Sequence, residues 1–290
     1  MKENKLLRGL CVLTAALMLG LTGCASSSDA NGSDAQSQAD TAEVQSAWTE
    51  LDQTTITKEM GMGWNLGNQL EASNAGIPSE TTWGNPTISE DLIKAVKEQG
   101  FKTVRIPVSY LDKIGAAPDY TIDSAWLDRV QEVVDYVVGN DLYAIINIHG
   151  DGYYTVDKSW LRCVDDNQDE IKDKYEKVWA QIADRFKDYD QHLIFESMNE
   201  ESDNTYGKPN AIGYENINAY NQIFVDTVRK TGSNNEKRWL LIPGWNGDKG
   251  FGVINRSTRE ITQPDLIAAM MRAINSDGDY EIAAPKGFEK

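Results

Sequence analysis

Short apolar runs that alternate with segments of helical periodicity constrain the fold of this 290-residue chain more than any other feature. Such alternation predicts a parallel α/β sheet with helices packed against it. The run from Tyr143 to His149 is mostly apolar, as in strands that are buried on both faces. The expected strands cover residues 61–65, 103–107, 143–149, 193–199 and 239–243. The expected helices cover residues 89–99, 124–138, 171–186 and 217–228.

A parallel sheet of this kind is either an open, doubly wound sheet or a closed (β/α)₈ barrel. A doubly wound nucleotide-binding sheet has a G-x-G-x-x-G loop after its first strand. Gly61, Gly63 and Gly67 do not have this spacing, and the indole of Trp64 would crowd a pyrophosphate. We therefore expect a barrel (a TIM barrel) and no cofactor. A complete barrel takes about 250 residues. The roughly 200 residues that hold five strands here predict an incomplete one.

The charge balance limits the partners of the chain. Lys and Arg total 28 and Asp and Glu total 45, which gives a net charge of −17. An acidic surface repels nucleic acid and other polyanions, so neutral partners such as sugars are favoured. The histidines, His149 and His192, and the three cysteines have no zinc-ligand spacing, and we expect no metal site.

The N-terminus has the pattern of an export signal. A basic segment precedes an apolar stretch at residues 9–21, which is too short to span a bilayer. The stretch ends in Leu-Thr-Gly-Cys, which resembles the lipobox of bacterial lipoproteins and predicts lipidation of Cys24. We expect residues 1–23 to be a signal peptide and residues 24–47 a disordered polar tether. The exported protein would then be anchored to the membrane at the cell surface; the alternative is an ordinary signal peptide with an incidental cysteine.

Polar residues stand at the ends of successive expected strands. Arg105, His149 and the pair Asn199-Glu200 would meet at one rim, which is where (β/α)₈ barrels have their chemistry. Each alone also fits a structural role, such as a salt bridge, a core histidine or a solvated acidic loop. Strand alternation places Glu196 below Glu200, and we expect Glu196 to pair with Arg105. Glu200 at the mouth, desolvated by aromatic rings, would serve as a general acid.

These strand ends belong to motifs that resemble glycoside hydrolase family 5, the cellulase family of (β/α)₈ enzymes. The resemblance runs from about Gly61 to Asn246 and is specific, because six motifs occur in the family's order. The motifs, in one-letter code, are GWNLGN at 63–68, TWGNP at 82–86, GFKTVRIPV at 100–108, INIH at 146–149, HLIFESMNE at 192–200 and LIPGWN at 241–246.

The resemblance implies a role for each matched residue. Glu200 corresponds to the acid/base of the family, and Asn199 to the residue that contacts the sugar 2-hydroxyl. Arg105 and His149 correspond to residues that shape the subsite around the nucleophile. Many relatives have a second His or a Trp where this chain has Gly150.

Aromatic residues in the expected loops supply flat surfaces for sugar rings. The candidates for stacking are Trp64, Trp83, Tyr153, Tyr154, Trp160 and Trp245. We assign substrate binding to Trp83, Tyr154 and Trp245, together with Asn65 in the first motif. Trp126 and Trp179 follow helical periodicity and are expected in the core.

The resemblance implies a retaining endo-β-1,4-glucanase that acts on β-glucan, and such an enzyme needs a second carboxyl as nucleophile. Residues 48–246 would be the N-terminal part of the barrel and residues 247–290 a divergent tail in which the family's nucleophile motif has no match. Glu281 is the nearest candidate, and residues 262–274 have the pattern of a short helix. The chain is therefore expected to be truncated. The alternative function is a non-catalytic, degenerate carbohydrate-binding surface lipoprotein.

Overall fold

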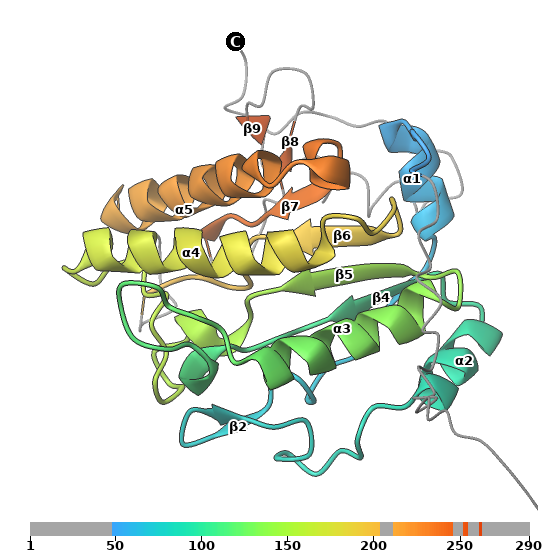
Figure 1. Ribbon diagram of the computed structural model, residues 1–290, viewed down its shortest axis with the longest axis horizontal. Helices are drawn as coiled ribbons and strands as arrows, with labels where there is room; N and C mark the ends of the chain where they lie inside the picture. The colour runs from blue at the N-terminus through green and yellow to red at the C-terminus, as the bar shows by residue number, and fades with distance from the viewer. Residues whose placement is uncertain (1–47, 204–210, 246–251, 255–260, 263–290) are drawn as a thin grey trace, which may run out of the picture. The chain divides into compact units, whose positions relative to one another are not determined.

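A computed structural model describes residues 48–203, 211–245, 252–254 and 261–262 (Figure 1). The expected signal peptide, Cys24, the tether and Glu281 lie outside the described residues. The main sheet has the strand order β1-β4-β5-β6-β7-β8-β9. Its first five strands are parallel neighbours, as the sequence predicted. They are β1 (Gly63–Asn65), β4 (Thr103–Ile106), β5 (Tyr143–Asn147), β6 (Leu193–Glu196) and β7 (Leu240–Ile242).

Two further strands continue the sheet beyond β7 in the antiparallel direction. They are β8 (Gly252–Ile254) and β9 (Ile261–Thr262). Both lie in the segment that the sequence assigned to a divergent tail. Thr262, the expected first residue of a helix, belongs to β9, and the rest of that expected helix lies outside the described residues. A separate hairpin pairs β2 (Ser73–Asn74) with β3 (Ile77–Pro78).

Five α-helices are described, and four of them cover the helices that the sequence predicted, although α4 begins three residues and α5 six residues before the expected start. They are α1 (Gln53–Met60), α2 (Glu90–Glu98), α3 (Ser124–Val138), α4 (Gln168–Phe186) and α5 (Ala211–Lys230). Side-chain caps explain two of the starts: Ser89 accepts the Leu92 amide before α2, and Asp123 accepts the Ala125 amide before α3. In Figure 1, α3, α4 and α5 lie side by side and run along the strands. No helix in the described ranges is both long and apolar enough to cross a membrane.

The strands are buried on both faces because different elements cover each face. Every residue of β5 is buried. Tyr143 and Ile145 pack with Ile56 of α1, whereas Ala144 and Ile146 belong to the larger core beneath the outer helices. The two expected core tryptophans, Trp126 and Trp179, are buried in that larger core. The β5 pattern confirms the strand interpretation and explains why the sequence shows a run rather than an alternation.

Side chains of α4 and α5 hydrogen-bond Ser197, the residue that follows β6. The Tyr175 hydroxyl donates to the backbone oxygen of Ser197 at 2.8 Å, and Trp179 Nε1 donates to the same oxygen at 3.1 Å. The Ser197 hydroxyl donates to Asn221 Oδ1 at 2.6 Å. Since these groups are buried, satisfying them fixes the backbone that leads directly to Asn199 and Glu200.

Candidate active site

Arg105 and Glu196 form an ion pair across the inner face of the sheet. Arg105 lies on β4 and Glu196 on β6, with β5 between them. Arg105 Nε donates to Glu196 Oε2 at 2.6 Å and its Nη2 donates to Oε1 at 2.7 Å. This bidentate pair confirms the sequence prediction that Glu196 is the partner of Arg105. Arg105 Nη2 also donates to Asn199 Oδ1 at 2.7 Å, so the pair orients the asparagine beside Glu200.

The ion pair is largely removed from water. The side chain of Glu196 is 2% exposed and that of Arg105 is 21% exposed. Burial alone would lower the pKa of Arg105, but the Glu196 carboxylate outweighs this and raises the pKa above its usual value. The arginine is therefore a permanent cation at the base of the site.

Tyr153 connects the two residues of the Asn199-Glu200 pair. Its hydroxyl donates to Glu200 Oε2 at 3.0 Å and accepts a hydrogen bond from Asn199 Nδ2. Burial, followed by the charge of Glu200, raises the pKa of Tyr153 above its ordinary value, so the phenol stays protonated. Glu200 itself is exposed rather than desolvated by aromatic rings, which differs from the expectation. β6 ends at Glu196, so Glu200 lies beyond the strand, after the buried residues Ser197, Met198 and Asn199.

His149 lies in a hydrogen-bonded chain that defines its proton positions. Val108 donates its backbone N–H to Asn147 Oδ1 at 3.3 Å, so the amide nitrogen of Asn147 faces His149 Nδ1 at 3.2 Å. Nδ1 is then an acceptor, and the proton of the neutral imidazole is on Nε2. Burial, and then the charge of Arg105, lowers the pKa of His149 to about 3. His149 therefore stays neutral at every pH at which an ordinary histidine begins to titrate.

Because the chain has two histidines, nuclear magnetic resonance of the imidazole groups tests this state directly. The Asp190 side chain hydrogen-bonds His192 and raises its pKa, whereas His149 is held neutral. From pH 8 to pH 5 we expect the His192 signals to titrate and the His149 signals to stay at the neutral imidazole position. His192→Gln assigns the signals. Any imidazole signal that titrates in that variant comes from His149 and would contradict its neutral state.

Gly150 follows His149, at the position where many members of the family that the motifs resemble have a second His or a Trp. Its N–H donates to Ser109 Oγ at 2.9 Å. A Cβ added at Gly150 would lie 2.6 Å from the same oxygen, so a side chain here requires Ser109 to move. The glycine at this position therefore allows the segment that holds Ser109 to approach the backbone of Gly150 closely.

Two predicted substrate-binding residues lie on open surface at the rim. Asn65 ends β1 and is paired in register with Arg105, which places it beside the ion pair. The side chain of Trp83 is 51% exposed, and its indole Nε1 donates to the Ser73 backbone oxygen at 3.0 Å. That hydrogen bond fixes the ring while leaving an apolar face open. Both residues keep the roles that the sequence predicted for them as proposals.

The other two predicted aromatic contacts find no support in their surroundings. Trp245 is 7% exposed and packs in the main core, with its ring 6.0 Å from that of Tyr214. The guanidinium of Arg162 lies 5.1 Å from the ring centre of Tyr154, and the Tyr154 hydroxyl donates to Asp165 at 3.0 Å. The adjacent Tyr153, not Tyr154, contacts Glu200. Neighbouring side chains in this loop differ in direction, which the sequence does not reveal.

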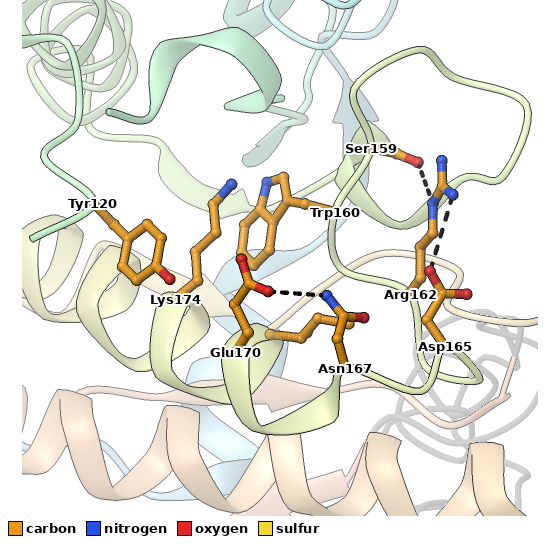
Figure 2. A pocket seen from close by; sticks show the side chains of 9 residues that line it. Tyr120, Ser159, Trp160, Arg162, Asp165, Asn167, Glu170 and Lys174 are labelled. Carbon is orange, nitrogen blue, oxygen red and sulfur yellow. Dashed lines mark hydrogen bonds and ion pairs between the residues drawn. The ribbon is translucent and has the colours of Figure 1, made fainter. Parts of the chain in front are cut away.

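Trp160 borders a separate cavity of about 220 Å³ beside the first turns of α4 (Figure 2). The Lys174 ammonium lies 4.4 Å from the centre of the Trp160 ring, and Trp160 Nε1 donates to Asp151 at 2.7 Å. These contacts hold the Trp160 ring in place beside the cavity. The residues that line the cavity are Tyr120, Ser159, Trp160, Arg162, Asp165, Asn167, Glu170, Ile171 and Lys174.

Sequence reasoning missed the roles of Tyr153 and Asn147 in the site. Asn147 stands within the apolar run of β5, where a buried amide is a signal for a hydrogen-bonded network. Tyr153 was recognised only as a possible stacking ring. In the described part of the chain, no group of three or more His, Cys, Asp or Glu side chains is arranged to hold a metal ion. The assembled groups are an acid at the rim, a fixed amide and a buried cation, which suit acid/base chemistry on a neutral substrate.

Comparison with known proteins assigns the chain to a family. The family model described as Cellulase (glycosyl hydrolase family 5) matches residues 67–270. The chain is 60% identical over 200 residues to Endoglucanase A of Paenibacillus barcinonensis, covering 69% of this chain and 50% of that protein. It is 38% identical over 239 residues to Endoglucanase A of Ruminococcus albus, covering 78% of this chain and 64% of that protein.

Solved structures give the same result. A family 5 xyloglucanase from Paenibacillus pabuli has a TM-score of 0.67 and 54% identity, covering 79% of this chain and 61% of that chain. A broad specificity endoglucanase from Ruminococcus champanellensis, solved with cellotriose, has a TM-score of 0.66 and 39% identity, covering 77% of this chain and 65% of that chain. The chain spans about half the length of the curated relative from Paenibacillus barcinonensis. The α/β fold is that of a partial TIM barrel.

Proposed function

The chain belongs to glycosyl hydrolase family 5, the cellulase family, and from this premise we propose that it is a retaining endo-β-1,4-glucanase with Glu200 as the acid/base. The observation that carries the proposal is the hydrogen-bonded series from Glu196 through Arg105 and Asn199 to Tyr153 and Glu200. A carbohydrate-binding surface alone has no need for an exposed carboxyl oriented by a buried cation. An acid/base does need such orientation.

In the proposed reaction, Glu200 protonates the oxygen of the leaving sugar while a second carboxyl attacks the anomeric carbon. Glu200, now ionised, then removes a proton from the water that hydrolyses the glycosyl-enzyme, and the enzyme is regenerated. Asn199, oriented by Arg105, is positioned to hydrogen-bond the sugar 2-hydroxyl. The reaction uses two carboxyls and water, so it requires no cofactor. Glu281, the candidate nucleophile from the sequence, lies outside the described residues.

We propose β-1,4-glucan as the substrate class. Trp83 offers an exposed, fixed ring at the rim, and aromatic faces bind the C–H surfaces of sugars. A neutral polymer also suits a chain with a net charge of −17. Among the structural neighbours, one endoglucanase was solved with cellotriose and another is a xyloglucanase, which supports a β-glucan for this chain.

Digestion of cellohexaose tests the proposal and separates it from a purely binding role. The chain is expected to release cellodextrins of intermediate length, and to leave α-linked maltohexaose intact. Binding of cellohexaose without cleavage would support the alternative, a non-catalytic carbohydrate-binding protein. The exposed ring of Trp83 suits either function, because aromatic faces bind sugars with or without cleavage. A chain that neither binds nor cleaves cellohexaose would contradict both functions.

We also propose that the protein is exported and anchored in the membrane through a lipid on Cys24. The support is the sequence pattern of a short apolar stretch, a Leu-Thr-Gly-Cys motif and a polar segment up to residue 47. Several acyl chains on one cysteine anchor a protein stably. Recovery of the protein in the membrane fraction, and its loss in Cys24→Ala, is the expected result; equal recovery of the two would contradict lipidation.

A further inference from the structure

Glu201, the residue after the proposed acid/base, is buried although its neighbour is exposed. The residue is 1% exposed, and its Oε2 has no hydrogen-bond partner among the described residues. A solvated acidic loop was the structural alternative for Glu200 and the acidic residues after it, and the burial of Glu201 does not fit that alternative. Burying an ionised carboxylate that lacks hydrogen bonds costs far more free energy than burying the neutral carboxylic acid.

The Glu201 carboxyl packs directly on the backbone of the loop that carries Tyr153. A Cβ added at Gly152 would overlap both carboxyl oxygens of Glu201, so the carboxyl occupies the space beside the Gly152 Cα. Tyr153 is the next residue, and its hydroxyl contacts both Asn199 and Glu200. Glu201 therefore supports the backbone of this loop at Gly152, and the loop in turn orients Asn199 and Glu200 through the Tyr153 hydroxyl.

In the described part of the chain, the titratable groups that interact with Glu201 include no cation. Asp151 lies in the same loop, and its carboxyl accepts the backbone N–H groups of Tyr110 and Leu111. Burial raises the pKa of Asp151 to about 6, and burial followed by the charge of Asp151 raises the pKa of Glu201 well above its usual range. The other titratable groups that interact with Glu201 are a thiol and three phenols, which are neutral when protonated and negative when ionised. They are Tyr153, Cys163, Tyr175 of α4 and Tyr220 of α5.

We propose that Glu201 is a positioning residue that, as a neutral carboxylic acid, braces Gly152 and so holds the Tyr153 hydroxyl between Asn199 and Glu200. The proposal rests on the proposed function, because its consequence is the orientation of the acid/base. Ionisation of Glu201 places a negative charge beside Asp151 and weakens this support. Activity is therefore lost on the alkaline side when Glu201 ionises, in addition to any loss from Glu200 itself.

The effect on stability has a definite sign. The folded state keeps its proton on Glu201 to a higher pH than the unfolded state, in which a glutamate has a pKa of about 4.3. The neutral carboxyl thus contributes its full stability below that pKa, and the contribution is lost as pH rises through the folded pKa. The side chain in Glu201→Gln is neutral at every pH. The fall in melting temperature that Glu201 causes between its unfolded and folded pKa should therefore be absent from this variant. Glu215→Gln makes the same change at an exposed position of α5 and should leave the dependence as in the wild type.

Glucan hydrolysis measured against pH tests the positioning role. Glu201→Gln should keep kcat within about twofold of the wild type at acidic pH and extend its alkaline limb by about one pH unit, with KM unchanged. Glu201→Ala, which leaves space beside Gly152, should lower kcat about tenfold. Gly152→Ala should impair folding or kcat by itself, because its methyl group overlaps the Glu201 carboxyl. Combined with Glu201→Ala, it should restore part of the lost kcat.

The outcomes separate this proposal from the proposed function. A wild-type pH–rate profile in Glu201→Gln, or no recovery in the double variant, would overturn the positioning role while leaving the glucanase in place. If the wild type neither binds nor cleaves cellohexaose, the proposed function fails, and the positioning role fails with it. In that case the melting curves still decide the state of Glu201: a Glu201→Gln curve parallel to that of the wild type would overturn a neutral buried carboxyl.

Discussion

Glu200→Gln is expected to lower the kcat for β-glucan hydrolysis by about 10²–10⁴-fold, the range that general acid–base catalysis supplies. The amide cannot protonate the leaving sugar, and it cannot activate water for the second step. The change preserves shape, and Tyr153 can still donate to the remaining side-chain oxygen. Cellohexaose affinity should therefore stay within about threefold of the wild type, since binding does not use the proton. Calorimetry measures the affinity, and release of reducing ends measures the rate.

A change of leaving group identifies the step that is lost. An aryl cellobioside with a dinitrophenyl leaving group departs without protonation, so Glu200→Gln should still form the glycosyl-enzyme and release a burst of phenol. Glu215→Gln, an exposed glutamate on α5, should behave as the wild type with both substrates. Equal losses on activated and natural substrates would show that Glu200 is not the acid/base. A rate near that of the wild type on β-glucan would show the same.

Arg105→Met is expected to lower the free energy of unfolding by about 3–5 kcal/mol, because it leaves a buried carboxylate without its cation. The side chain of Glu196 is 2% exposed, and Arg105 donates a hydrogen bond to each of its carboxylate oxygens. The same change frees the Oδ1 of Asn199, so activity should fall even at temperatures at which the variant is folded. Chemical denaturation and residual hydrolysis measure the two effects.

A matched arginine and a double variant show whether the cost arises from the buried charge. Arg185 on α4 pairs with Asp128 at the surface, and Arg185→Met should cost less than about 1 kcal/mol. Adding Glu196→Gln to Arg105→Met removes the unpaired charge and should recover at least half of the lost stability, without recovering activity. A stability loss in Arg105→Met no larger than that in Arg185→Met would contradict the account of the buried pair.

The parallel arrangement of the first five strands was predictable, because strands that are buried on both faces appear in the sequence as apolar runs. The antiparallel strands β8 and β9 were not predicted. β5 is the clearest case, with α1 on one side and the outer helices on the other. The strand ends were less well defined. Residues 193–199 were expected as one strand, but β6 ends at Glu196, whose carboxylate accepts a hydrogen bond from Arg105. The alternation of the sequence continues through Met198, so it does not mark the residue at which pairing with β5 stops.

The pairing of Arg105 with Glu196 was predictable, because strand alternation places both on the inner face. The roles of loop residues were not. Tyr153 and Tyr154 are adjacent and chemically identical, and only the loop geometry directs the first to Glu200 and the second to Asp165. Burial of Glu201 depends on the space beside Gly152, and burial of Trp245 depends on packing in the core. Such features arise from tertiary packing, which a single sequence does not encode locally.

The central claim, that this chain cleaves β-1,4-glucan through Glu200, is tested most directly by one measurement. It is the initial rate of reducing-end release from a soluble β-1,4-glucan by residues 24–290, beside Glu200→Gln and with a melting curve for each sample. The account predicts steady release by the wild type and almost none by the variant. Equal rates in the two, or no release from a wild-type sample that melts cooperatively, would contradict it.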